Sequence, residues 1–280
     1  MQMISLLYGI GIGEAKMNDG WVAWAAILGA AAWIPQVVTF LFRMFAKPSL
    51  QFLPSSTVEI GYTSYGPILN PGFAISTKRK DALIEKIKLL LRHEDGDEHE
   101  LQWQFLSEPQ YEIESSTGEI QTSRKNQPVA GLKVTTAVLI DRKIGFQDVG
   151  FINRRMEIYN RLLEKEEHVR KVKPDGFPEL LFEEKEWTDI ENFIRDEFYW
   201  KAGKYTLTLM AYETSKKRPY VESYVFEMTR TQIEILARNV EITQQAMKYQ
   251  YLYNAHKAGA PLKFIWAWIT PFIIRQTNRH

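Results

Sequence analysis

The sequence KIKLLLRHEDGDEHELQWQF, residues 86–105, contains two short runs in which apolar and polar side chains alternate. A period of two with one apolar face is typical of half-buried β-strands. The acidic residues between the runs surround Gly96, so the pair predicts a β-hairpin. The apolar positions of the two runs are Ile87, Leu89, Leu91, Leu101, Trp103 and Phe105.

Short strands separated by turn residues recur along the chain after residue 48. This pattern predicts a mainly β fold with added helices (α+β), in which an antiparallel β-sandwich-like domain spans residues 48–228. Residues 107–127 contain Pro, Ser and Gly and show no period, which predicts a loop. Further strands are predicted at residues 57–62, 72–77, 132–140, 205–211 and 220–226.

The segment from Trp200 to Leu209 has a glycine, then Tyr205, then an alternating strand. It resembles the late-strand entry of immunoglobulin-like and fibronectin-like sandwiches. The resemblance covers about ten residues and implies an architecture without an activity. It also implies that the Tyr205 hydroxyl ties a corner of the chain.

Two helices are predicted within and after the strands. Apolar residues at helical spacing predict a helical insertion near residues 152–171. A long helix is predicted at residues 229–258. The capping-box pattern from Thr231 to Glu234 begins it, and Gly259 and Pro261 end it.

The composition limits the classes of function. Lys plus Arg number 35 against 34 Asp plus Glu, so no global positive field attracts nucleic acid. Cysteine is absent, whereas secreted domains of this size often contain disulfides. We therefore expect no nucleic-acid partner and a cytoplasmic location for the domain.

The run from Gly20 to Phe42 contains 23 residues without a charged side chain. This length predicts a transmembrane helix over residues 20–46, preceded by an N-terminal tail at 1–19. A signal peptide and a buried core helix are the alternatives. The basic residues Lys16, Arg43 and Lys47 favour an outside N-terminus and a cytoplasmic C-terminal body in a single-pass protein.

The uncharged run also contains aromatic and small residues. Tryptophans favour the membrane interface, and small residues four apart let membrane helices approach and associate. This predicts homo-oligomerisation through the helix. The residues concerned are Trp21, Trp24, Ala25, Ala26, Gly29, Ala30 and Trp33.

The C-terminal tail, residues 261–280, includes 11 uncharged residues at 264–274. This segment is too short to span a bilayer, and a helix lying in the interface fits its length. Trp266 and Trp268 would then lie at headgroup depth. Packing against the N-terminal span is the alternative.

Catalytic, phosphate-binding and zinc-finger motifs are absent from the sequence, so no cofactor is expected. The densest group of potential metal ligands is His93, Asp95, Asp97 and His99. The two histidines could converge across the hairpin, but zinc sites usually recruit cysteine or a third histidine. A solvated acidic turn is therefore the better explanation of the group, and the four residues are only weak candidates for a metal site.

Three functional hypotheses follow. The first is a membrane-anchored, non-enzymatic interaction or scaffold module that displays its sandwich at the cytoplasmic face. Its partners would be the lipid bilayer and either another protein or further copies of this chain. The second is a membrane-perturbing effector of the bacterial defence type, which oligomerises through the helix. The third is an enzyme with an acidic site around Asp95 and Asp97.

Overall fold

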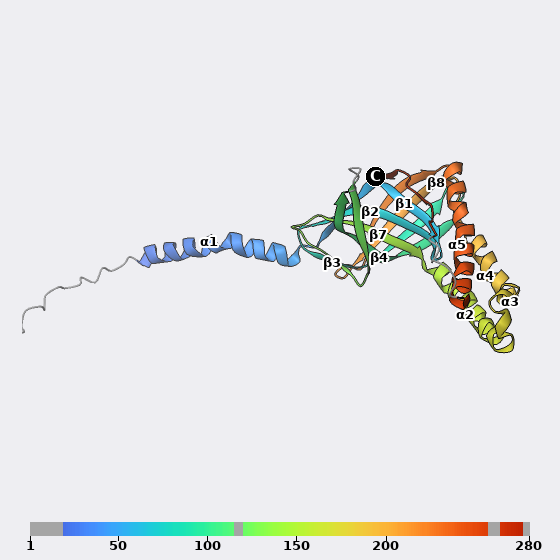
Figure 1. Ribbon diagram of the computed structural model, residues 1–280. Coiled ribbons are helices and arrows are strands. Elements are labelled where there is room, and N and C mark those ends of the chain that lie inside the picture. Colours follow the sequence, from blue (N-terminus) through green and yellow to red (C-terminus); the bar gives the residue numbers. More distant parts are fainter. Residues whose placement is uncertain (1–18, 115–119, 257–263, 277–280) are drawn as a thin grey trace, which may run out of the picture. The chain divides into compact units, whose positions relative to one another are not determined.

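A computed structural model of the protein describes residues 19–114, 120–256 and 264–276 (Figure 1). The contacts within the chain divide it into two units, one ending at Lys47 and one beginning at Pro48. Most of the predicted N-terminal tail and the predicted end of the long helix, Gly259 and Pro261, lie outside the described residues.

The first unit contains α1 (Asp19–Phe45), which covers the predicted membrane span. Within the part of the chain that the structure describes, no helix is both long and apolar enough to cross a membrane. The prediction of a single-pass membrane protein with a cytoplasmic body is therefore wrong. The prediction relied on a single feature, the absence of charged side chains from Gly20 to Phe42.

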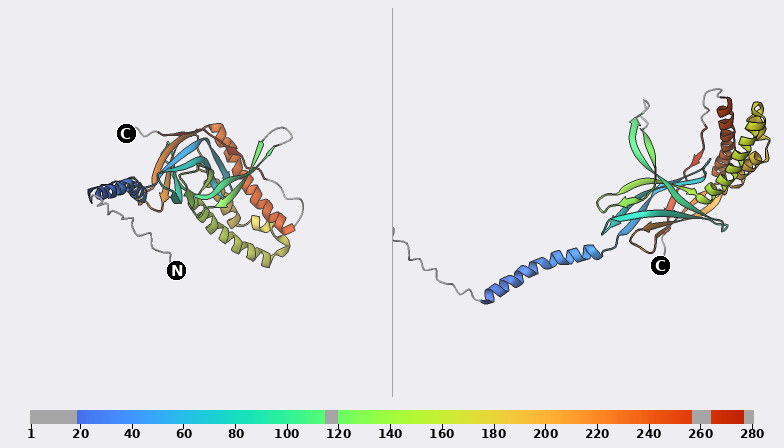
Figure 2. Two further views of the ribbon diagram at one scale, coloured as in Figure 1. Left: turned by 90° about the vertical axis from the view of Figure 1, so that its left-hand side faces the viewer. Right: turned by 90° about the horizontal axis from the view of Figure 1, so that it is seen from below.

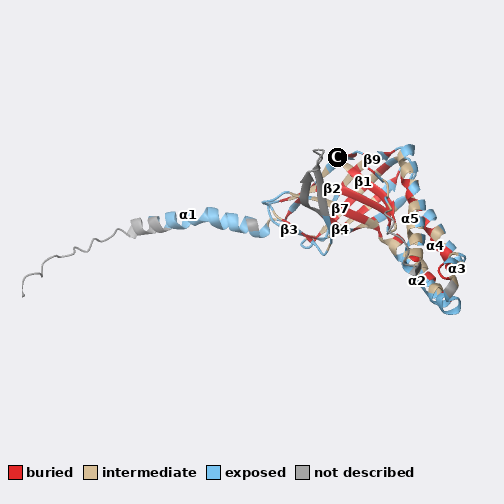
Figure 3. Ribbon diagram, in the orientation of Figure 1, coloured by how far each residue is buried: buried red, intermediate tan, exposed pale blue. Residues whose placement is uncertain are grey.

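The described side chains of α1 are exposed (Figure 3). Trp24 and Trp33 are 65% and 67% exposed, and a Cβ built on Gly29 would meet no atom within 4 Å. Ala30 is exposed as well, while the side chains of Trp21, Ala25 and Ala26 lie outside the described set. Association through this helix therefore stays a prediction.

The second unit is built on one antiparallel sheet with the order β10-β1-β2-β7-β4-β3-β8-β9-β11, in which β5 pairs with β4 and β6 with β3. Figure 2 shows that the sheet curls into a half-barrel. The strands are β1 (Ser49–Thr63), β2 (Gly66–Lys78), β3 (Ala82–His93), β4 (Glu98–Glu114), β5 (Ile120–Pro128), β6 (Leu132–Val134), β7 (Ile140–Asp148), β8 (Gly203–Glu213), β9 (Tyr220–Met228), β10 (Trp268–Ile269) and β11 (Ile273–Arg275).

The predicted sandwich is wrong because the strands form this single curled sheet. Alternating strands need one buried face, and a sheet that curls around its own side chains provides it without a second sheet. The enclosed core includes Phe52, Leu89, Phe146 and Leu207, each fully buried. The predicted hairpin is present, with Arg92 on β3 opposite Glu98 on β4.

Two local predictions also need correction. The predicted strand at 132–140 is two strands, because β6 ends at Val134 and β7 begins at Ile140. The predicted loop at 107–127 instead contains the second half of β4 and most of β5, which pair along their lengths. Cross-strand pairing there overrides the weak local pattern.

The C-terminal segment is extended and joins the sheet, so the prediction of an interfacial helix is wrong. Its β10 pairs with β1, placing Ile269 opposite Ile60, while its β11 pairs with β9, placing Ile273 opposite Phe226. The segment thus links the first strand of the sheet to β9. The edges of β1 and β9 each present a row of backbone hydrogen-bonding groups. Such rows favour an extended chain over a helix, because the backbone groups of a helix are already paired with one another.

The helices form a second core beside the sheet (Figure 1). The long helix begins with a capping box at Thr229 and Gln232, two residues before the predicted one. Gln232 N donates to Thr229 Oγ1 at 3.3 Å, and Thr229 N donates to Gln232 Oε1 at 2.9 Å. The helices are α2 (Val149–Val172), the 3₁₀ helix η1 (Pro174–Gly176), α3 (Glu179–Phe182), α4 (Lys185–Asp196) and α5 (Arg230–His256).

Candidate functional site

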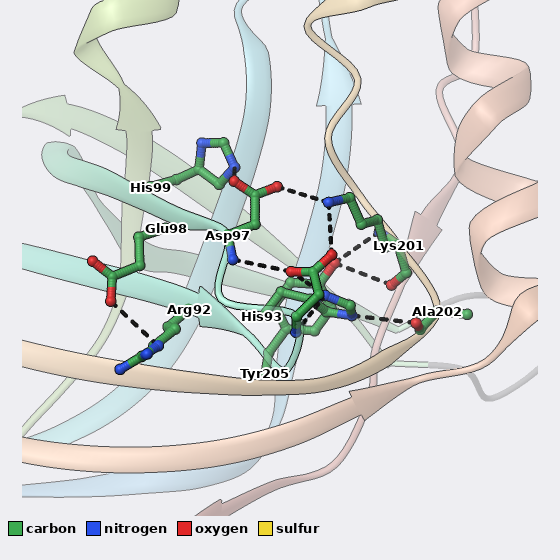
Figure 4. A network of polar contacts seen from close by, with 9 residues as sticks. Arg92, His93, Asp97, Glu98, His99, Lys201, Ala202 and Tyr205 are labelled. Atoms are coloured by element: carbon green, nitrogen blue, oxygen red, sulfur yellow. Dashed lines mark hydrogen bonds and ion pairs between the residues drawn. The ribbon is translucent and has the colours of Figure 1, made fainter.

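The four residues considered as metal ligands meet at the turn between β3 and β4, but a lysine lies among them. Figure 4 shows His93, Asp97 and His99 around Lys201. Lys201 Nζ is 2.9 Å from Asp95 Oδ2 and 3.0 Å from Asp97 Oδ2. His93 Nδ1 is 2.9 Å from Asp95 Oδ1, and His99 Nε2 is 3.3 Å from Asp97 Oδ1. The ammonium group therefore supplies the positive charge that a metal ion would bring.

Lys201 is held at this turn by the residues on either side of it. The Trp200 indole N–H donates to the Gly61 carbonyl at 3.2 Å. The Tyr205 hydroxyl accepts from the Lys201 N–H at 2.7 Å and donates to the Lys201 carbonyl at 3.0 Å. Gly203, with φ of +132°, lets this loop approach the hairpin, since a Cβ there would lie 2.8 Å from His93 Nε2.

The charges of this cluster stabilise one another. Hydrogen bonds from Lys201 hold the pKa of Asp95 and of Asp97 below the usual range, and the two carboxylates raise the pKa of Lys201. A general acid or base works best with a pKa near the operating pH. Among the described residues, no three His, Cys, Asp or Glu side chains are placed to hold a metal ion. The cluster therefore ties two loops together.

Trp266 and Trp268, predicted to lie in a membrane interface, are held on the second unit. The Trp266 indole N–H donates to Thr243 Oγ1 on α5 at 3.0 Å. The Trp268 ring lies directly over Gly61 on β1, where a Cβ would come within 2.6 Å of it. Both indoles line a cavity on the sheet.

This cavity, which we call the sheet cavity, has a volume of about 520 Å³. It lies over the face of the sheet opposite the core, because its residues Glu59, Asn70 and Lys143 alternate with the core residues Ile60 and Leu69. Its volume is in the range of small-molecule sites. The aromatic side chains that line it are Tyr65, Phe105, Trp266 and Trp268.

Two of the aromatic walls rest on glycines. Trp268 covers Gly61, and the Phe105 ring covers Gly145 on β7 so closely that any Cβ there would overlap it. Glycine inside a strand often marks such a close approach. Because these glycines have no side chain, the two rings can approach the backbone closely.

One polar group in the sheet cavity has no partner. Asn70 is 6% exposed, and among the described residues its Oδ1 receives no hydrogen bond. A buried polar atom without a partner costs about 1–3 kcal/mol. The charged residues beside it, Lys143 and Glu59, form an ion pair with each other. The cavity thus offers an uncharged acceptor between aromatic walls.

Of the residues lining this cavity, Trp266 and Trp268 were predicted as functional residues for a different reason, Phe105 was predicted only as an apolar strand position, and Asn70 was not predicted. A glycine within an alternating strand, as at Gly145, is the sequence signal that could have indicated the walls. No family model and no curated protein matches this chain.

Proposed function

We propose that the protein is a non-enzymatic binding module whose sheet cavity takes a small, flat ligand with a hydrogen-bond donor. The observation that carries this proposal is the unpartnered Oδ1 of Asn70 in a cavity of about 520 Å³ with aromatic walls. A ligand N–H would satisfy that oxygen, and its ring would pack against the aromatic side chains.

The charge of the sheet cavity supports an uncharged recognition group at Asn70. Lys143 and Glu59 are its only charged lining residues within the described chain, and they neutralise each other. A charged group placed beside Asn70 would lose hydration without meeting an unpaired opposite charge. This part of the ligand is therefore neutral and polar.

Chemistry at the acidic turn is less well supported. Lys201 keeps the Asp95 and Asp97 carboxylates ionised, so neither residue is poised to exchange a proton near neutral pH. The carboxylates are also engaged in ion pairs that join two loops.

Benzamide provides a direct test, because it is flat and has an N–H donor, while acetophenone has the same shape without the donor. We expect benzamide to bind about tenfold more tightly than acetophenone in NMR titrations. In Asn70→Leu, which removes the acceptor, the two affinities should become equal. Absence of benzamide binding, or the same preference in Asn70→Leu, would refute the proposal.

A further inference from the structure

A second cavity adjoins the sheet cavity. This helix cavity, also of about 520 Å³, lies between α2 and α5. Ser64, in the turn between β1 and β2, and Trp266 line both cavities. The two spaces therefore meet at this turn and at the Trp266 indole.

The helix cavity carries a net positive charge. Its charged lining residues are Arg155, Glu166 and Arg170. Arg170 binds Glu166 through Nε and Nη2, at 3.0 and 2.9 Å. Arg155, in contrast, has no ion-pair partner among the described residues. One guanidinium charge thus remains available to a ligand.

Arg155 lies at the end of the helix cavity that is nearer the sheet. It is six residues after Val149, where α2 leaves β7, so it lies about 9 Å along the helix. Glu166 is 11 residues further along, about 16 Å beyond Arg155. An acidic group bound at Arg155 therefore lies about three helical turns away from Glu166 along α2.

Hydroxyl groups line the same space. Tyr159 follows Arg155 by one helical turn and also lines the cavity. Tyr251, on α5, is 8% exposed, and its hydroxyl lies near Tyr159 and Glu166. Burial raises its pKa, as do the nearby Tyr159 and Glu166, so it stays a protonated donor.

We propose that the two cavities form one elongated site, in which Asn70 binds the flat, neutral end of a ligand and Arg155 binds its acidic end. This inference rests on the proposed function of the sheet cavity. The acidic group is a carboxylate or a phosphate, since both match the planar guanidinium.

The rise per residue of β2 gives the approximate length of such a ligand. Asn70 is four residues after Gly66, the first residue of β2, which corresponds to about 13 Å along the strand. A ligand that runs from Asn70 past the turn between β1 and β2 toward Arg155 therefore needs a length on the order of 13 Å. A benzoate is therefore too short, and an acid on a flexible chain is required.

The probes are 4-carbamoylphenoxy-alkanoic acids of increasing chain length, each compared with its methyl ester. In the full-length protein we expect acid and ester to bind equally when the chain is short. At the length that reaches Arg155, the acid should bind about tenfold or more tightly, as expected for a charge-assisted hydrogen bond. A phosphonate of that length tests whether phosphate is preferred over carboxylate.

The matched variants are Arg155→Met and Arg161→Met. Arg161 is exposed on the same helix and does not line the cavity. The preference for the acid should disappear in Arg155→Met and persist in Arg161→Met, with benzamide binding unchanged in both. Equal binding of acid and ester at every length, with benzamide still bound, would overturn this inference alone. If benzamide also fails to bind, the proposed function itself is wrong.

Discussion

The side chain of Asn239 on α5 holds both polar groups of the Ala267 backbone. Asn239 Nδ2 donates to the Ala267 carbonyl at 2.7 Å, and Oδ1 accepts from the Ala267 N–H at 2.8 Å. Asn239 is fully buried. This pair therefore fixes the segment that carries the two indoles of the sheet cavity, Trp266 and Trp268.

Replacing Asn239 with Leu should release this segment. The Ala267 N–H and C=O would lose their partners, so we expect a loss of about 2–4 kcal/mol in the free energy of unfolding, measured by urea denaturation. Benzamide binding should weaken as well. Asn160→Leu, at an exposed position of α2, is the control. Equal stability of the two variants would contradict the role given to Asn239.

Gly145→Ala should disturb the wall of the sheet cavity. The added methyl group would overlap the Phe105 ring, and overpacking of this kind costs about 1–3 kcal/mol. Gly131→Ala is the control, because the nearest atom to its Cβ lies at an ordinary 3.5 Å. The double variant Gly145→Ala/Phe105→Leu should recover part of the stability. If the double variant recovers no stability, overlap with the Phe105 ring is not the cause of the loss in Gly145→Ala.

The acidic turn predicts a pH dependence of stability. The folded protein lowers the pKa of Asp95 and Asp97, so their contribution is present above the ordinary pKa of about 4 and is lost as the pH falls through the folded-state values. The free energy of unfolding should therefore decrease from about pH 4 downwards.

Lys201→Met tests the origin of this dependence. Without the ammonium group the two carboxyl pKa values return toward the ordinary range, so the variant should lose less stability on acidification and be less stable at pH 7. Lys204→Met, at an exposed position of β8, should behave as the wild type. Urea denaturation at a series of pH values measures the free energy of unfolding of both variants and of the wild type. Parallel curves for the wild type and Lys201→Met would exclude this mechanism.

Tyr205→Phe should loosen the loop that carries Lys201. The variant removes both hydrogen bonds between the hydroxyl and the Lys201 backbone, which predicts a loss of about 1–3 kcal/mol at neutral pH. Burial raises the pKa of Tyr205 to about 12, so the wild type should also lose stability as the pH rises through this range. In Tyr205→Phe this alkaline loss should be smaller, as followed by thermal unfolding.

The exposed apolar side chains of α1 predict association. Exposed apolar surfaces of this kind usually mark a site that another molecule covers. We expect the full chain to sediment as an oligomer and Pro48–His280 as a monomer. Gly29→Leu should weaken association if the helices approach closely at that glycine. Identical masses for the full chain and the fragment would show that α1 does not mediate assembly.

Local patterns predicted individual elements where neighbours in sequence are also neighbours in space. The hairpin at Gly96 and the helix from Val149 follow from period and turn residues alone. The capping pattern of α5 occurs twice, at Thr229 and at Thr231, and the pattern cannot choose between them.

The candidate site depends on residues far apart in the sequence. Lys201 lies more than a hundred residues after Asp95, and Asn70 meets Trp266 only because the C-terminal segment returns to β1. The eleven uncharged residues of that segment included Ile269 and Ile273, whose β-branched side chains favour strands. A single sequence does not show which strands pair, so this segment was misassigned.

The closure of the sheet by its last strands has a consequence for biosynthesis. In the second unit β1 is synthesised early and β9 late. Each strand keeps an open edge until residues 268–275 pair with it. Open edges can pair with other chains. Until these residues are synthesised and docked, the nascent protein carries two such edges, so it is most prone to pair with other chains, and most in need of a chaperone, before this step.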